Sequence, residues 1–322
     1  MRRLPLLLAL LALPLLATWA PRSLARQEPP PEKSWVRFEP VLIEEGAPER
    51  RRVGRLLFLE GWSLRSNDAR FGGVSALHVE DGEVTAITDS GSHLSFRIPV
   101  RGDRSPAAIG TAGGPTGDKR ARDAEAMAVA GGQVWVAYER TNRVERFERG
   151  SWKLQSSATP GLMRKWRANT GSEALVRLRD GRFLVFSEGR SGTDRPSEAV
   201  LFAGDPAVEG TKAAAFSFAR PEGYRVTDAA ELPDGRLLIL ARRFSFLEGI
   251  SAKLLVADTK SLAEGAILRG EEVAHFEPPI TVDNMEGLSV GREQGRTIVW
   301  MASDDNFLNF QRTLLLKFAL MD

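Results

Sequence analysis

The sequence predicts an all-β fold: a single β-propeller closed into a ring, with five blades favoured and six as the alternative. A unit of two short apolar strands around a Gly-containing turn occurs five times, roughly every 50 residues, which is the spacing of propeller blades. A third apolar run follows each copy, and a more variable fourth strand is expected to complete an antiparallel blade. No unit has a 3.6-residue apolar period, which disfavours a helical solenoid. The copies begin at Val74, Ala124, Ser172, Asp228 and Met285.

Residues 1–25 are expected to form a secretory signal peptide. Arg2 and Arg3 precede a Leu- and Ala-rich run, and small residues lead up to an expected cleavage site after Ala25. We therefore expect a periplasmic or secreted protein with no membrane span after signal cleavage. An uncleaved membrane anchor is the alternative, because the apolar run is close to the lower limit for spanning.

The rest of the chain is expected to comprise a linker and one domain. Residues 26–38 form a Pro-rich linker, and residues 39–322 form the propeller. The last repeat leaves no room for a fourth strand, so the strand-like segment 41–66 is predicted to supply it, closing the ring and removing exposed sheet edges. The hairpin turns are expected at Asp81-Gly82, Gly131-Gly132, Asp180-Gly181, Asp234-Gly235 and Gly291 to Gly295.

The composition excludes several kinds of site and partner. The chain contains no Cys, which excludes thiol catalysis and Cys-ligated zinc. Cleavage after Ala25 would remove three arginines and change the formal charge of +2 to about −1. Basic residues are interspersed with acids, so we expect no nucleic-acid partner. We expect a monomer.

Acidic residues recur at two matched positions of the repeat, the start of the inner strand and the end of the next strand. Eight of these ten positions hold an acid, whereas 42 acids in 322 residues would place about one there by chance. The two strands are antiparallel and the inner strand lines a propeller's channel, so the acids are predicted to converge at one channel mouth. The first position holds Ser75, Glu125, Glu173, Asp228 and Glu286, and the second holds Asp89, Glu139, Glu188, Arg242 and Asp304.

Crowded carboxylates require neutralisation, and this predicts either bound cations or nearby bases at the mouth. Oxygen ligands suit Ca²⁺ rather than zinc or copper, so Ca²⁺ is the expected cofactor. The alternative is a structural role, in which the acids accept hydrogen bonds from loop amides or pair with arginines. The expected metal ligands are Asp89, Glu125, Glu173, Glu286, Asp304 and Asn306.

Four residues are candidate catalytic groups. Glu125 or Glu286 is expected to act as a base and Arg242 to bind the substrate anion. His93 follows the second strand of the first repeat, so we expect it to face the mouth as a general acid or base. Residues 287–291 match the Gly-x-Ser-x-Gly pattern of nucleophilic serines, but an apolar inner strand is the wrong context for that motif.

Several motifs also carry a resemblance to a known family. They span residues 71–77, 88–91, 122–126, 169–175, 283–288 and 303–315. This pattern resembles the phytase-like family called "esterase-like activity of phytase" over residues 70–320. The resemblance implies an exported bacterial propeller with ester or phosphoester hydrolase activity. It also implies that the six expected metal ligands match the family's recurring polar positions. The Asp-rich signatures of calcium-dependent propeller phytases are absent.

Three functions follow as hypotheses. The first is an exported esterase or phosphoesterase acting on a small-molecule ester at a Ca²⁺-binding channel mouth. The second is a non-catalytic periplasmic propeller that binds a peptide, glycan or envelope partner, since fold alone does not choose between them. The third is a lactonase-like hydrolase that also uses a channel Ca²⁺.

Overall fold

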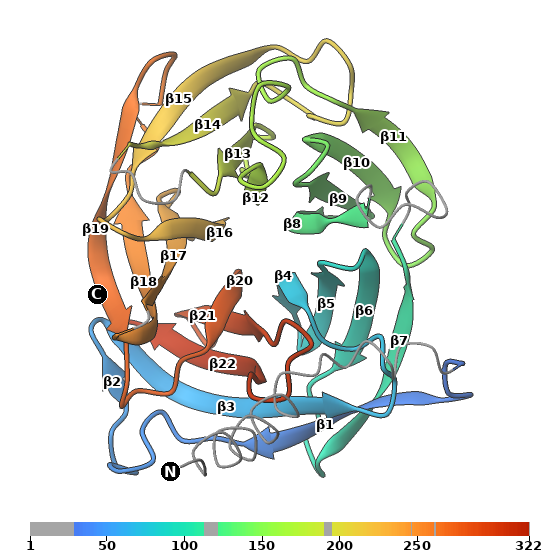
Figure 1. The fold of residues 1–322 in the computed structure, drawn as a ribbon, viewed down its shortest axis with the longest axis vertical. Coiled ribbons are helices and arrows are strands. Elements are labelled where there is room, and N and C mark those ends of the chain that lie inside the picture. Colours follow the sequence, from blue (N-terminus) through green and yellow to red (C-terminus); the bar gives the residue numbers. More distant parts are fainter. Residues whose placement is uncertain (1–28, 113–121, 190–194, 246, 261, 322) are drawn as a thin grey trace, which may run out of the picture.

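The computed structural model confirms an all-β chain (Figure 1). It describes residues 29–112, 122–189, 195–245, 247–260 and 262–321, and within these residues no α-helix is present. In this part of the chain no helix long and apolar enough to cross a membrane occurs. The predicted signal peptide and its cleavage site after Ala25 lie outside the described residues.

The described strands pair into five antiparallel four-stranded units around a central axis (Figure 1). Each inner strand contacts the inner strands of both neighbouring units, so the ring is complete. From the inner to the outer strand, the units are β4 (Val74–Glu80), β5 (Glu83–Thr88), β6 (Ser92–Arg97) and β7 (Arg104–Thr111); β8 (Ala124–Ala130), β9 (Gln133–Tyr138), β10 (Arg143–Glu148) and β11 (Leu154–Ala158); β12 (Ser172–Arg177), β13 (Phe183–Ser187), β14 (Ser197–Phe202) and β15 (Ala213–Ala219); β16 (Arg225–Glu231), β17 (Leu237–Ser245), β18 (Gly249–Ala257) and β19 (Ile267–Phe276); and β20 (Asn284–Glu293), β21 (Arg296–Asp304), β22 (Thr313–Leu320) and β3 (Leu56–Ser66).

The N-terminal segment closes the ring, as the sequence predicts. The outer strand of the fifth unit is β3, which pairs with β22, the last strand of the chain. Strand β1 (Ser34–Pro40) then pairs with both β3 and β7 and joins the fifth unit to the first. A short strand, β2 (Arg52–Val53), forms a hairpin with β3. Strand β1 begins inside the segment expected to be a linker, because Val36 and Phe38 are buried in the core.

The hydrophobic core lies between the units rather than within one central mass. Among the described residues, one buried cluster lies at each of the five junctions between neighbouring units. At the junction of the fifth and first units, for example, Trp300 and Leu315 pack with Leu77 and Leu94. Each sheet therefore buries both faces, and its strands read as continuous apolar runs. This packing leaves the two ends of each inner strand to carry polar side chains.

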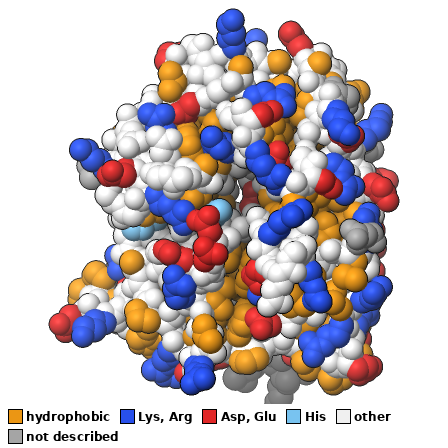
Figure 2. All heavy atoms as spheres, turned by 180° about the vertical axis from the view of Figure 1, so that it is seen from behind, with side chains coloured by type: hydrophobic (Ala, Val, Ile, Leu, Met, Phe, Trp, Pro, Cys, Tyr) orange, Lys and Arg blue, Asp and Glu red, His pale blue; other side chains and the backbone are white. Residues whose placement is uncertain are grey.

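The outer surface carries no single-sign patch on the face that Figure 2 shows. Basic and acidic side chains are mixed across it, around a narrow hollow near the middle of the ring. This distribution agrees with the interspersed charges of the sequence.

Candidate functional site

Every inner strand contains a β-bulge at the same place, immediately after its first residue or residues. The register slips at Ser75 in β4, Glu125 in β8, Glu173 in β12, Thr227 in β16 and Glu286 in β20, so each of these residues has no partner on the next strand. A bulge bends a strand and re-aims the side chain of the extra residue. The bulges therefore give the repeat a fixed polar position at one end of the channel.

The fourth unit corrects one of the sequence assignments. The sequence alignment placed Asp228 with Glu125 and Glu286, but the bulged residue of β16 is Thr227. Seven of the ten matched positions thus hold an acid. Asp228 is buried and points elsewhere: its carboxylate accepts hydrogen bonds from the backbone N–H of Ala229 (2.8 Å) and of Leu288 (2.7 Å) in the neighbouring unit. Asp228 therefore has the structural role that was the alternative expected from the sequence, because it accepts hydrogen bonds from backbone amides.

On one side of the ring, arginines neutralise the carboxylates. Nη2 of Arg242 lies 3.0 Å from Oε1 of Glu286 and 3.9 Å from Oε1 of Glu188. Nη1 of Arg225 donates to the same Glu188 oxygen at 2.8 Å. Glu286 also accepts a hydrogen bond from Nδ2 of Asn284 at 2.8 Å. These carboxylates already have cationic partners supplied by the chain.

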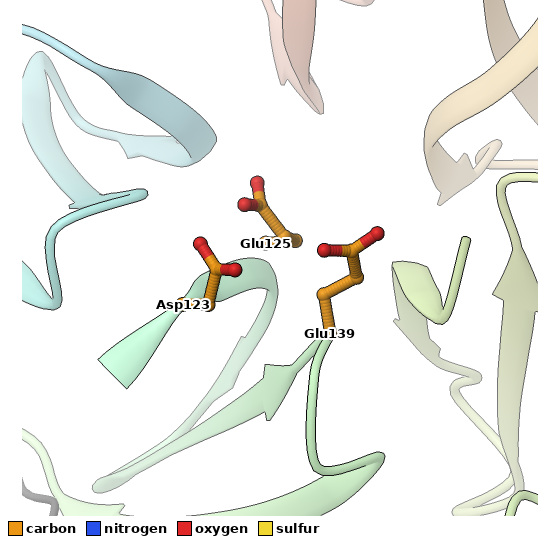
Figure 3. Close-up of side chains that lie close together, drawn as sticks. All are labelled: Asp123, Glu125 and Glu139. Atoms are coloured by element: carbon orange, nitrogen blue, oxygen red, sulfur yellow. The ribbon is translucent and has the colours of Figure 1, made fainter. Parts of the chain in front are cut away.

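On the other side of the ring, three carboxylates lie close together, and fewer positive charges neutralise them. Oxygens of Asp123, Glu125 and Glu139 all lie within 4.8 Å of one another, and Figure 3 shows the three side chains directed toward a common space. The backbone N–H of Glu139 donates to the carbonyl of Asp123 at 2.9 Å, which ties the two residues together. Arg140 pairs with Asp123. The site is therefore asymmetric, with arginines on one side and carboxylates on the other.

The pKa values of these acids are raised in the folded protein. Burial, followed by the carboxylates of Glu173, Glu286, Asp123 and Asp89, raises the pKa of Glu125 well above its usual value. Burial, followed by the charges of Asp123 and Glu188, raises the pKa of Glu139 to about 7. An unneutralised carboxylate cluster behaves in this way, and a bound cation would reverse the effect.

Burial and repulsion between neighbouring carboxylates also raise the pKa values of Glu173 and Asp304, which places both residues in the same group of acids at the channel mouth. Burial, followed by Glu188, Glu139 and Glu286, raises the pKa of Glu173 well above its usual value. Burial, followed by Glu286 and Asp89, does the same for the pKa of Asp304. The structure therefore brings together Asp89, Glu125, Glu173, Glu286, Arg242 and Asp304, as the sequence predicts.

The side chain of Asn306 does not join these acids. Its backbone N–H donates to Oδ1 of Asp304 at 2.6 Å, but its side-chain amide is exposed and donates to Gln311 at 3.1 Å. Asn306 thus orients the Asp304 carboxylate through its backbone, and its amide oxygen is not placed among the carboxylates.

His93 is not at the mouth, which corrects the sequence-based expectation. Strand β6 begins at Ser92, so His93 belongs to a third strand and not to the preceding loop. Its ring stacks on Trp152 at a centroid distance of 4.3 Å and an angle of 11°. Burial, followed by the charge of Arg70, lowers the pKa of His93 to about 4, so it is neutral at pH 7.

Ser289 of the Gly-x-Ser-x-Gly sequence is a packing residue, as expected. It lies inside β20, is buried, and accepts a hydrogen bond from the backbone N–H of Val79 at 3.0 Å. This bond links the fifth unit to the first and leaves the serine inaccessible to a substrate.

Sequence reasoning missed two residues of the site. Asp123 directly precedes β8, and Arg225 starts β16, three residues before Asp228, where the sequence placed the start of that unit. Both face the second matched position of the repeat: the backbone N–H of Glu139 donates to the carbonyl of Asp123, and Arg225 is paired with Arg242 in the strand register. Gly73, Gly171 and Asn284 occupy this position elsewhere, so no repeated residue type marks it.

The carboxylates of Asp123, Glu125 and Glu139 fit a calcium ion. Ca²⁺ binds carboxylate oxygens at 2.3–2.6 Å, so two ligand oxygens across one ion are roughly 5 Å apart. Mutual distances within 4.8 Å satisfy this limit. Of the six expected ligands, only Glu125 belongs to this trio, and Glu286 is already held by Arg242 and Asn284.

Solved structures of similar shape are distant in sequence. The glutaminyl cyclase of Myxococcus xanthus is 12% identical at a TM-score of 0.49, over 84% of this chain and 100% of the cyclase chain. A luciferin-regenerating enzyme is 10% identical at a TM-score of 0.45, over 88% of this chain and 97% of that chain. The major allergen of Malassezia sympodialis is 7% identical at a TM-score of 0.46, over 76% of this chain and 92% of that chain. These scores carry no conclusion about activity.

A family model gives a firmer assignment. No curated protein is similar enough in sequence to count as a match. The model of the phytase-like family matches residues 69–307, well over half of the chain, and these residues include all ten repeat positions of the ring. The chain therefore belongs to the phytase-like family, whose description is esterase-like activity of phytase.

Proposed function

We propose that this protein hydrolyses small-molecule esters or phosphoesters at the channel mouth and that Asp123, Glu125 and Glu139 bind Ca²⁺ there. The observation that carries the proposal is the mutual approach of these three carboxylates to within 4.8 Å. Membership of a family described by esterase-like activity supports the reaction class.

The two sides of the ring suit different parts of an ester. A bound Ca²⁺ would polarise a substrate oxygen and acidify a water molecule. On the opposite side, Arg242 is held by Glu286, and its buried Nε–H has no partner among the described residues. The guanidinium group thus retains capacity to donate to a negatively charged oxygen of the substrate.

Glu286 is the best-placed base. Asn284 and Arg242 fix its carboxylate, and burial, partly offset by Arg242 and Asn284, raises the pKa of Glu286 above its usual value. A carboxylate with a pKa nearer to neutrality accepts a proton more effectively at the working pH. Glu125 is assigned to the metal rather than to proton transfer, which narrows the two bases expected from the sequence to one.

The test is hydrolysis of a panel of nitrophenyl phosphates, nitrophenyl carboxylic esters and a lactone, in Ca²⁺ and in EDTA. We expect Ca²⁺-dependent turnover of at least one ester, lost in Glu125→Gln and kept in Glu264→Gln, whose side chain is exposed and remote from the ring. Glu286→Gln should lower kcat by about 10²-fold or more.

Other outcomes would assign a different function. Turnover of the lactone alone would support the lactonase-like reading. Ca²⁺ binding without hydrolysis of any compound would contradict the proposal and favour a binding propeller.

A further inference from the structure

A groove lies between the fifth and first units, where β20 and β4 end and therefore at the end of the channel opposite to the carboxylates. Its volume is about 680 Å³, in the range of small-ligand sites. Residues 78–82 and 98–100 form its wall on the first unit, and residues 290–293 with Glu60, Trp62, Trp300 and Lys317 form its wall on the fifth. Along β4, roughly 16 Å separates Ser75 at the mouth from Glu80 in this groove, at about 3.3 Å per residue. We call it the junction groove.

The walls of the junction groove are fixed by hydrogen bonds within the chain. The backbone N–H of Val79 donates to Oγ of Ser289 at 3.0 Å, which joins the first wall to the strand that carries the second. The backbone N–H of Ile98 donates to the carbonyl of Gly82 at 2.8 Å and holds the two segments of the first wall together. Every residue of the lining belongs to the described part of the chain.

Trp62 gives the junction groove a flat apolar surface. Its half-buried indole stacks on the ring of Trp300 at a centroid distance of 6.4 Å and an angle of 16°. The edge of Phe38 packs against it at 5.9 Å and 87°. An indole that is held on two sides has one orientation, and its remaining surface can pack against the C–H face of a ligand ring.

Ion pairs place hydrogen-bond donors and acceptors beside this aromatic surface. Nζ of Lys317 lies 2.7 Å from Oε2 of Glu293, and Nη1 of Arg149, from the second unit, lies 2.8 Å from Oε2 of Glu80. His78 lines the groove near Glu80, and burial, partly offset by Glu80, lowers the pKa of His78, so its imidazole is neutral at pH 7. A neutral imidazole has one donor and one acceptor. The groove therefore offers both kinds of partner, as ligand hydroxyls require.

The charges around the junction groove are nearly balanced. Four acids line it, and the two cations of the lining are joined by Arg149, which pairs with Glu80. The result is four negative charges against three positive ones, which gives an anionic ligand no net attraction. This balance favours an uncharged ligand and separates the groove from the carboxylate ring. The acids are Glu60, Glu80, Asp81 and Glu293, and the cations of the lining are Arg292 and Lys317.

We propose that the junction groove binds an uncharged oligosaccharide. A sugar ring combines an apolar C–H face with hydroxyls around its edge, and the groove combines the indole of Trp62 with the fixed polar groups of Lys317, Glu293, Glu80 and His78. The inference goes beyond the proposed function and does not depend on it, because the groove and the carboxylate ring lie at opposite ends of the channel.

The first test is calorimetric titration with maltotriose, cellotriose and the trisaccharide of N-acetylglucosamine. The titrations are made in EDTA, so that a calcium-dependent mouth does not contribute. At least one trisaccharide should bind. Trp62→Ala should weaken that binding at least tenfold because it removes the aromatic surface, whereas Trp62→Phe, which keeps a ring, should retain most of it. Melting curves of both variants check that the fold is intact.

The second test uses exposed residues, whose replacement leaves the core unchanged. Glu80→Gln/Glu293→Gln removes two charged acceptors from the groove and should weaken binding of the same trisaccharide about tenfold. The matched control is Glu264→Gln/Glu271→Gln, which removes the same charge from exposed positions outside the groove and should bind like the parent protein.

Two results would overturn the inference. One is the absence of binding for all three trisaccharides, and the other is equal binding by the parent protein, Trp62→Ala and Glu80→Gln/Glu293→Gln. Asp123→Asn, at the carboxylate ring, should bind the sugar like the parent protein, and a loss there would assign the sugar to the ring and also overturn the inference. Failure of ester hydrolysis leaves these titrations unaffected, so the two proposals fail separately.

Discussion

Nη2 of Arg242 lies 3.0 Å from Oε1 of Glu286, so the residue that breaks the acidic repeat in the fourth unit neutralises the bulged acid of the fifth. With Arg225, which pairs with Glu188 at 2.8 Å, it gives one side of a nearly symmetric ring a positive partner. On the opposite side, Arg140 pairs with Asp123, and among the described residues no ion pair joins Glu125 or Glu139 to a cation. Under the proposed function, this asymmetry would orient an ester in a nearly five-fold ring.

Replacement of Arg242 should destabilise the protein through the acids that it leaves behind. We expect Arg242→Gln to lower the free energy of unfolding by about 3 kcal/mol at pH 7, because Glu286 loses its cation in a largely buried site. Urea denaturation measures this loss. The double variant Arg242→Gln/Glu286→Gln should recover part of it. A double variant as unstable as the sum of both single variants would show that the pair is not coupled.

Removal of metal should make stability fall as the pH rises. The pKa of Glu139 is about 7 in the folded protein, against an ordinary value of 4.5. The folded state therefore binds more protons than the unfolded state between these values, and its stability decreases from about pH 4.5 to pH 7. Denaturation in EDTA across this range measures the decrease.

Glu139→Gln provides the matched control for this pH dependence. It should flatten the curve, with the variant more stable than the parent by on the order of 3 kcal/mol at pH 8, at 1.36 kcal/mol per pKa unit. In Ca²⁺ the order should reverse, because the parent alone keeps the full ligand set. Parallel curves for parent and variant in EDTA would contradict the assignment.

His93 should matter for packing and not for catalysis. We expect His93→Gln to cost about 1 kcal/mol of stability by loss of the stack on Trp152. The kcat and its pH profile should stay unchanged. A general acid or base would lose about 10²–10⁴-fold in rate on removal. A loss of that size in His93→Gln, with the fold intact, would show that His93 acts in catalysis.

Asp228 should behave as a structural acid. Asp228→Ala leaves the buried N–H groups of Ala229 and Leu288 without their acceptor, so we expect a loss of about 2 kcal/mol in unfolding free energy. The shift in melting temperature caused by Ca²⁺ should remain. Disappearance of that shift would place Asp228 in the metal site after all.

The sequence was sufficient to predict the architecture because the repeat encodes it locally. Apolar runs of strand length and turn residues define each hairpin; at Asp81-Gly82, both residues take positive φ values of 50° and 74°, as a two-residue hairpin turn requires. The closing strand β3 also followed from a simple count, since the last repeat lacked its outer strand. Both arguments depend on covalent order and periodicity, which the sequence states directly.

The sequence was less informative about the site because the spacing between the bulge and the glycine turn differs between units: Ser75 lies seven positions before Gly82, whereas Thr227 lies eight positions before Gly235. In β16 the extra residue is Thr227, and counting from the glycine turn placed Asp228 there. Asp123 and Arg225 lie at a position where the other units carry Gly or Asn, so no repeated chemistry marked them. His93 was misplaced because the loop after β5 is shorter than expected and β6 begins at Ser92.

The measurement that tests the central claim most directly is the melting temperature in Ca²⁺ and in EDTA, for the parent protein, Glu125→Gln, Asp123→Asn and the surface control Glu264→Gln. Binding to the folded state alone stabilises it by about 2.7 kcal/mol at a Ca²⁺ concentration 100 times Kd. The parent and Glu264→Gln should therefore melt several degrees higher in Ca²⁺, whereas Glu125→Gln and Asp123→Asn should melt at the same temperature in both. Identical melting of the parent protein in Ca²⁺ and in EDTA would contradict the claim that these three carboxylates form a calcium site.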